Sequence, residues 1–120
     1  MYISVCIPKF VIDWSTYFLF SNLFTVPPVV YIKPSEQTFK VGDSVTLTCY
    51  ADGFPLPSYY WLRNGALVIP NSRISVNHNQ LAFSNMVQSD GGAYSCLAEN
   101  LAGDDTAIAT LQYIGNTGNS

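Results

Sequence analysis

The sequence predicts an all-β fold in which short strands form a sandwich or barrel. Two observations lead to this prediction. Between residues 29 and 114, short segments of alternating apolar and polar residues are separated by turns rich in Gly, Pro, Asn and Asp. In addition, no segment carries apolar residues at a convincing helical period. We therefore expect one domain over residues 27–114, flanked by segments of different composition.

The first half of this domain is expected to contain two edge strands and one core strand. The edge strands are predicted at 29–33 and 38–41, on either side of Pro34. After a turn at 41–44, residues 44–50 alternate strictly, with Val45, Leu47 and Cys49 on one face. Residues 52–57 contain Pro55 and Pro57 and are expected to form a rigid loop.

The second half begins with a strand predicted at 59–63, which carries Trp61. The Asn64-Gly65 pair that follows is a strong hairpin signal, because both residues readily adopt positive φ. Further strands are predicted, in chain order, at 66–69, 73–76, 80–84, 93–100 and 106–114. A turn at 102–105 connects the last two strands.

The segment SDGGAYSC, residues 89–96, has three competing interpretations. It could be a glycine-rich anion cradle, a reactive-thiol site, or a turn that leads a strand into a disulfide. An anion cradle needs a following helix whose first amides face the anion. Here the next residues continue as a strand, which argues against the cradle.

Two runs of fixed spacing carry the most specific signal in the chain. They are Cys49-x-Ala51-x-Gly53-x-Pro55-x-Pro57-x-Tyr59-x-Trp61 and Asp90-x-Gly92-x-Tyr94-x-Cys96-x-Ala98-x-Asn100-x-x-Gly103. Apolar Leu81-x-Phe83 and Met86 lie between them. Together these positions resemble the signature of an immunoglobulin domain of the I-set, as found in hemicentin-like and cell-adhesion tandem proteins. The resemblance covers residues 27–114.

This resemblance implies an immunoglobulin-like Greek-key β-sandwich of two antiparallel sheets. One disulfide is expected to join the sheets, with an indole packed against it and a tyrosine hydroxyl fastening the nearby corner. An arginine and an aspartate are expected to pair at one end of the sandwich; a role of this pair in ligand binding is the less favoured alternative. The residues to which these structural roles fall are Cys49, Cys96, Trp61, Tyr94, Asp90, Arg73 and Leu81.

Composition excludes several classes of function. The net charge is −3 and the basic residues are scattered singly, which argues against nucleic acid and anionic membrane surfaces. The single histidine, His78, lies in a polar turn, and two of the three cysteines are assigned to the core. Asp104 and Asp105 suggest a solvated hairpin tip rather than a calcium site, because no third carboxylate lies nearby in the sequence. We expect no enzymatic activity, no cofactor, no metal and no small-molecule substrate.

The flanking segments differ from the domain. Residues 1–26 are aromatic-rich and are interpreted as a leader, which is either a signal or anchor or a segment produced by a misassigned reading frame. Membrane association is expected only if this leader is an anchor. Cys6 lies in it and is not expected to be structural. Residues 115–120 are expected to form a flexible tail or linker.

The resemblance implies a binding or spacer module that acts through protein–protein contacts, with itself or neighbouring immunoglobulin domains among the partners. The cysteine pair favours an extracellular adhesion or matrix protein in the secretory pathway. The alternative is an intracellular, titin-like structural module of muscle; an antigen-receptor-like variable domain fits less well. The predicted partner surface comprises Tyr60, Leu62, Leu97 and Glu99, expected to point outward on neighbouring strands; the alternative is an ordinary solvent-exposed face. Edge strands near 29–41 and 106–114 are a second predicted surface.

Overall fold

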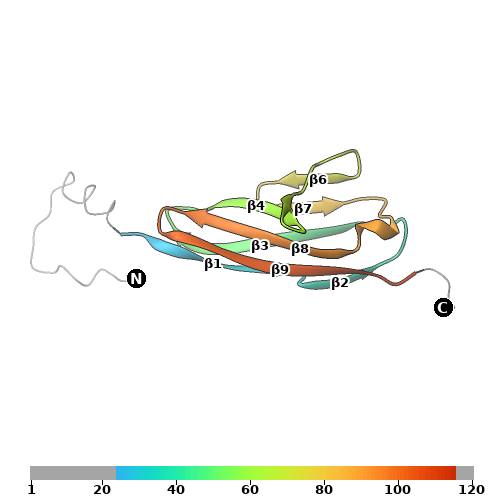
Figure 1. Ribbon diagram of the computed structural model, residues 1–120, viewed down its shortest axis with the longest axis horizontal. Helices are drawn as coiled ribbons and strands as arrows, with labels where there is room; N and C mark the ends of the chain where they lie inside the picture. The colour runs from blue at the N-terminus through green and yellow to red at the C-terminus, as the bar shows by residue number, and fades with distance from the viewer. Residues whose placement is uncertain (1–23, 116–120) are drawn as a thin grey trace, which may run out of the picture.

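The computed structural model describes residues 24–115 and shows a sandwich of two β-sheets (Figure 1). A short 3-10 helix (Gln88–Asp90) precedes the eighth strand. Residues 1–23 and 116–120 lie outside the described residues, and with them Cys6 and most of the predicted leader and tail. The strands are β1 (Val26–Lys33), β2 (Glu36–Phe39), β3 (Val45–Phe54), β4 (Ser58–Arg63), β5 (Ala66–Leu67), β6 (Ile74–Asn77), β7 (Gln80–Phe83), β8 (Gly92–Asn100) and β9 (Gly103–Tyr113).

The strands form a four-stranded sheet in the order β1-β3-β7-β6 and a five-stranded sheet in the order β2-β9-β8-β4-β5. The chain changes sheets at Pro34, whose missing N–H cannot continue a strand ladder. Because the chain does not reverse there, β2 runs parallel to β9, whereas every other pairing is antiparallel. This parallel pair departs from the expectation of two purely antiparallel sheets.

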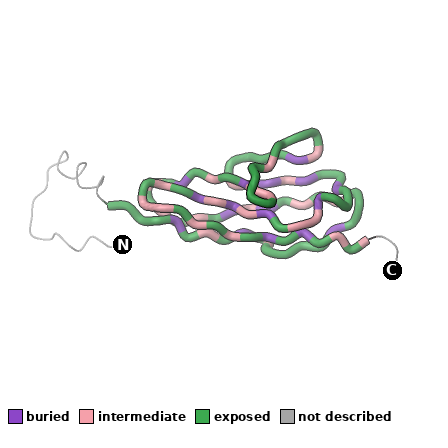
Figure 2. The backbone as a smooth tube through the Cα atoms, viewed as in Figure 1, coloured by how far each residue is buried: buried purple, intermediate pink, exposed green. Residues whose placement is uncertain are grey.

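Buried and exposed residues alternate along the strands (Figure 2), because successive side chains of a strand point to opposite faces. The inward-facing residues form one core between the sheets. A disulfide joins Cys49 of β3 to Cys96 of β8, with Cα atoms 6.3 Å apart and a sequence separation of 47. The predicted all-β sandwich with one disulfide between its sheets is therefore confirmed. The core comprises Ile32, Phe39, Leu47, Cys49, Trp61, Ile74, Leu81, Phe83, Met86, Tyr94, Cys96, Ala109 and Leu111.

Several strand boundaries differ from the sequence-based expectations. β3 continues to Phe54, through a segment expected to be a loop, because Val26 and Val29 of β1 pair with Phe54 and Asp52. The last strand begins at Gly103, because Asn100 pairs with Gly103 and shortens the turn to two residues. β5 is only two residues long, so the strand predicted at 66–69 is confirmed for residues 66–67 and wrong for residues 68–69.

Asn100 fastens the end of the sandwich where β1 begins. Its amide nitrogen donates hydrogen bonds to the carbonyl oxygens of Val26, at 2.8 Å, and Pro55, at 2.9 Å. Its amide oxygen accepts from the backbone N–H groups of Ala102, at 2.8 Å, and Gly103, at 3.2 Å. One side chain thus holds together the first strand, the β3–β4 connection and the β8–β9 turn.

Candidate functional site

The segment SDGGAYSC forms a structural corner of the sandwich. The Tyr94 hydroxyl donates a hydrogen bond to the carbonyl oxygen of Asp90 at 2.6 Å. The carboxylate of Asp90 accepts from the Arg73 guanidinium, at 2.7 and 3.2 Å, and from the backbone N–H of Val87, at 2.9 Å. Among residues 24–115, Asp90 is the one charged residue that is buried, and its hydrogen bonds hold the corner together.

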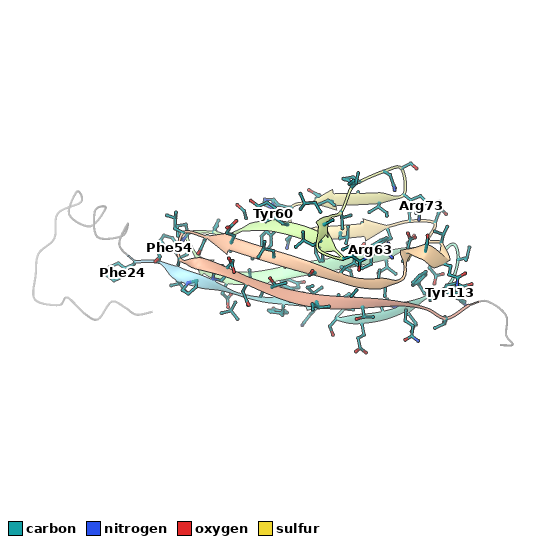
Figure 3. All side chains as sticks on the ribbon, in the orientation of Figure 1. Phe24, Phe54, Tyr60, Arg63, Arg73 and Tyr113 are labelled. Atoms are coloured by element: carbon teal, nitrogen blue, oxygen red, sulfur yellow. A yellow bond between two sulfur atoms is a disulfide. The ribbon has the colours of Figure 1, made fainter. Side chains whose placement is uncertain are left out.

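Arg63 completes this corner and is a residue that sequence reasoning missed. Its guanidinium donates to the carbonyl oxygens of Ser89, at 2.7 Å, and Gly91, and lies 5.0 Å from the ring centroid of Tyr94. Only the strand register reveals this contact, because it places Arg63 of β4 directly opposite Tyr94 of β8. Figure 3 labels Arg63, which lies at the end of β4, and Arg73, which lies immediately before β6.

Burial and charge act in opposite directions on the acid of the corner. Burial alone would raise the pKa of Asp90, but the hydrogen bonds from Arg73 and from the Val87 amide outweigh it and lower this pKa below its ordinary value. Burial raises the pKa of the Tyr94 hydroxyl. Asp90 is therefore a stable carboxylate at neutral pH, bound to a guanidinium and covered by protein.

The other chemically suggestive residues also have structural contacts. Cys49 and Cys96 form the disulfide, so neither is a reactive thiol. His78 lies in the turn between β6 and β7, and its ring contacts Tyr59 edge-to-face at 6.1 Å between centroids. One carboxylate oxygen of Asp105 accepts a hydrogen bond from the backbone N–H of Val30 at 2.9 Å, which joins β9 to β1. No group of three metal-ligating side chains occurs within residues 24–115.

The outer side of the five-stranded sheet has a different character, because apolar side chains lie there in cross-strand rows. We call it the apolar face and define it by Tyr60, Leu62, Leu67, Leu97 and Ile108. Tyr60 of β4 lies opposite Leu97 of β8, which lies opposite Thr106 of β9. In the next row Leu67, Leu62, Ser95 and Ile108 lie side by side across four strands. Directly opposed side chains on one face of a sheet are in contact range, so each row is continuous.

Tyr60, which Figure 3 labels on β4, is exposed, whereas Leu62 and Leu97 are half-buried. Their predicted direction agrees with the register, but both leucines were expected to be solvent-exposed. Neighbours in the rows account for the difference, since Leu62 lies between Leu67 and Ser95 and Leu97 lies beside Tyr60. The most exposed apolar members are Leu67, at 61%, and Ile108, at 64%.

Leu67 and Ile108 were not predicted as contact residues. The alternation that placed Ala107 and Ala109 on the inner side of the last strand also placed Ile108 on the outer side, and this was the available signal. Leu67 could not be assigned in this way, because only the pairing of β5 with β4 places it opposite Leu62. The register therefore extends the predicted surface across the sheet.

An acidic pair lies at one end of the apolar face. Glu99 of β8 is directly opposite Asp104 of β9, and both residues are exposed. Ser58 continues this row on β4. Like charges directly opposite each other on neighbouring strands destabilise a sheet, so the Glu99–Asp104 pair does not stabilise this sheet.

The second predicted surface, the edge strands, requires a correction. β1 is an edge strand of the four-stranded sheet, as expected. The last strand is not an edge over its second half, because Thr110–Tyr113 pair with Glu36–Phe39 of β2. The edges of the five-stranded sheet are β2 and β5. Within residues 24–115, no helix is long and apolar enough to cross a membrane.

Comparison with known proteins gives a consistent result. The family model for the immunoglobulin domain matches residues 27–100. The chain is 35% identical to mouse hemicentin-1 over 88 residues and 38% identical to mouse contactin-5 over 95 residues. These matches cover 72% and 79% of this chain but only 2% and 9% of the relatives. A solved complex of titin M10 with an obscurin-like 1 immunoglobulin domain is 25% identical, with a TM-score of 0.68, and the match covers 77% of this chain and 98% of that one.

Proposed function

This chain belongs to the immunoglobulin domain family, and from that premise we propose that it is a binding and spacer module of an extracellular adhesion or matrix protein. It is a non-catalytic module that works through protein–protein contacts. The contact surface is the apolar face, and the assignment to the I-set remains part of this proposal.

The observation that carries the proposal is the pair of apolar rows on the outer side of the five-stranded sheet. Leu67 and Ile108 are more than half exposed, and Tyr60 lies between them in the adjacent row. Exposed apolar side chains grouped on one face, with polar groups at the rim, are typical of a protein contact surface. Aromatic residues such as Tyr60 often contribute most of the binding energy at such surfaces.

Two observations support an extracellular setting. The Cys49–Cys96 disulfide is a type of bond that persists in oxidising compartments. Hemicentin-1 and contactin-5, which the chain resembles at 35% and 38% identity, are adhesion proteins. The chain covers a small part of each, so we propose that it is one unit of a longer protein.

The spacer role is supported by the placement of the chain ends. β1 enters at one end of the sandwich and β9 leaves at the opposite end (Figure 1). Neighbouring units on either side are therefore held apart by the length of the domain.

The likeness to the titin and obscurin-like 1 complex favours one alternative, an intracellular structural module of the titin type. The two settings differ in the redox state of the cysteines. Thiol alkylation of native material, followed by mass spectrometry with and without reductant, distinguishes them. A closed Cys49–Cys96 bond supports the extracellular proposal, and two alkylated cysteines support the alternative.

The contact surface is tested by a binding screen. The full chain, multimerised through a C-terminal fusion, is screened against an array of extracellular proteins that includes the chain itself. Each interaction found is then measured with the double variant Tyr60→Thr and Ile108→Thr, in which threonine retains a high strand propensity. We expect a loss of binding of tenfold or more, on the order of the contribution of central interface residues.

The matched control is Val41→Thr, which removes an exposed apolar side chain from a turn outside both sheets. It should leave binding unchanged. Binding that is equally insensitive to both variants, or no binding to any extracellular protein, contradicts the proposal.

A further inference from the structure

We propose that a second copy of this chain is a partner, and that the outer side of its four-stranded sheet docks on the apolar face. This inference rests on the proposed use of the apolar face for protein contact. It adds the identity of the partner, the docking surface on that partner, and the relative direction of the two copies.

The docking surface of the second copy is named here the tyrosine face and comprises Val29, Tyr31, Lys33 and Tyr50. Tyr31 of β1 lies directly opposite Tyr50 of β3, and their rings stack with centroids 5.0 Å apart and planes 20° apart. Tyr31 is 50% exposed, Tyr50 41% and Val29 63%. The Lys33 ammonium lies 5.8 Å from the Tyr31 ring centroid, so a positive charge accompanies the aromatic pair.

A partner that covers the acidic pair on the apolar face has to bring a positive charge to it, because the two carboxylates would otherwise be buried without a counter-charge. Glu99 and Asp104 are opposed, and none of the described residues that point out of this face is Lys or Arg. A symmetric contact between two apolar faces therefore supplies no cation to either pair. The cation has to come from another surface.

Within the described part of the chain, Lys33 is the basic residue suited to this role. The guanidinium groups of Arg63 and Arg73 are hydrogen-bonded within the corner. Lys40 follows β2 outside both sheets. Lys33, in contrast, is exposed on a sheet face next to exposed aromatic rings.

The spacing of charged and aromatic residues is the same on the two faces. On the apolar face, Leu97 precedes Glu99 by two positions, and on the tyrosine face Tyr31 precedes Lys33 by two positions. Two positions along a strand correspond to about 6.6 Å on either face. The stacked tyrosines can therefore lie over Tyr60 and Leu97 while the Lys33 ammonium lies over the two carboxylates.

Asp52 selects the direction of docking. It lies opposite Val29, on the side of the tyrosine row away from Lys33. If the second copy were reversed, Asp52 would lie over Glu99 and Asp104, and three carboxylates would repel one another. In the proposed direction Asp52 lies over the row of Leu62, Ser95 and Ile108, which contains no carboxylate.

Because the two surfaces are different, the docked pair retains one free apolar face on one copy and one free tyrosine face on the other. Such a contact does not close on itself unless its geometry forms a ring. We therefore expect association to continue beyond the dimer as concentration rises.

The test is sedimentation velocity on the full chain with Cys6→Ser, which prevents disulfide-linked dimers. This protein should show a concentration-dependent increase in sedimentation coefficient that weakens at high salt, since exposed charge pairs are screened. Lys33→Glu and the double variant Glu99→Lys with Asp104→Lys should each weaken association about tenfold or more. An equimolar mixture of these two variants should associate again, because the charges are then exchanged between the faces.

The matched control is Lys40→Glu, which makes the same change in net charge away from both faces and should still associate. The inference is overturned if the Cys6→Ser protein remains monomeric, if Lys33→Glu and Lys40→Glu behave alike, or if the mixture fails to associate. A monomeric chain that binds another extracellular protein through the apolar face overturns this inference only and leaves the proposed function intact.

Discussion

Asp90 shows how individual residues of the corner are used for stability rather than for chemistry. Its carboxylate accepts hydrogen bonds from Arg73 and from the Val87 amide, while its carbonyl oxygen accepts from the Tyr94 hydroxyl. This carboxylate accepts three hydrogen bonds and its residue is 3% exposed, so it is closed to a ligand from solvent. Asp90, Tyr94 and Cys96, the chemically reactive residues of SDGGAYSC, are therefore all engaged in internal contacts.

The lowered pKa of Asp90 predicts a specific pH dependence of stability. Its charge stabilises the folded state fully above the unfolded-state pKa, near the ordinary value of 3.8, and this stabilisation is lost as pH falls through the lower folded-state pKa. Asp90→Asn should lower the free energy of unfolding by about 1–3 kcal/mol at neutral pH, because charged hydrogen bonds are lost. The difference from wild type should shrink below about pH 4, as measured by urea unfolding.

Arg73→Gln serves as the companion variant, because it removes the guanidinium that lowers the pKa of Asp90. This variant should flatten the pH dependence of the free energy of unfolding over the same acidic range. A stability difference between wild type and Asp90→Asn that stays constant down to pH 2 would contradict this account of the corner.

At the scale of elements, the β8–β9 hairpin contributes to both the core and the contact surface. Its inner side carries Tyr94 and Cys96, and its outer side carries Leu97, Glu99 and Ile108. Asn100 fixes the turn of this hairpin to the start of β1 and to the β3–β4 connection. The position of the contact surface thus depends on the same hairpin that contains the disulfide and the corner.

Removal of this fastening should affect stability measurably. Asn100→Ala leaves the carbonyl oxygens of Val26 and Pro55 without their donor, and we expect a loss of about 1–2 kcal/mol. The comparison variant is Asn77→Ala, in which an exposed asparagine of β6 is replaced. Unfolding midpoints in urea should fall for Asn100→Ala and stay close to wild type for Asn77→Ala; equal midpoints for the two variants would refute the role of Asn100.

The sequence predicted the elements that alternation and fixed spacing define. The strand with Leu47 and Cys49 and the hairpin at Asn64-Gly65 follow from such patterns, and the disulfide partners follow from the resemblance to an immunoglobulin domain. Features that depend on pairing between distant strands were not predictable in this way. The parallel run of β2 along β9, the extension of β3 to Phe54 and the place of Leu67 beside Leu62 all require the three-dimensional register.

The contact surface, too, could be predicted only in part from the sequence. Alternation predicted the outward direction of Tyr60, Leu62, Leu97 and Glu99 along their strands, and the resemblance to an immunoglobulin domain implied that these two strands are neighbours. The half-burial of Leu62 and Leu97 could not be predicted, because it depends on cross-strand neighbours. Arg63 was missed because its contacts reach Ser89 and Gly91, which lie far away in the sequence.

At the scale of the whole molecule, a single disulfide joins the two sheets across a core of moderate size. It closes a loop of 47 residues, which corresponds to about 4 kcal/mol of stabilisation in the chain-entropy model. A domain of this size has a total stability of roughly 5–15 kcal/mol, so the bond contributes a large share.

The double variant Cys49→Ala with Cys96→Ala should therefore lower the free energy of unfolding by about 4 kcal/mol, as measured by chemical denaturation. Cys6→Ser, which removes the remaining cysteine of the sequence, is the control and should leave stability unchanged. If the loss caused by the double variant were below about 1 kcal/mol, the disulfide would not be a major stabilising element.

The central claim, that the apolar face is the surface on which a partner binds, is tested most directly by hydroxyl-radical footprinting of the free and bound chain. The partner is the one recovered in the binding screen, including a second copy of the chain. We predict that binding protects Tyr60, Leu67 and Ile108 from oxidation and leaves Val41, in its turn outside both sheets, as reactive as in the free chain. Unchanged oxidation of Tyr60, Leu67 and Ile108 in a saturated complex would contradict the claim.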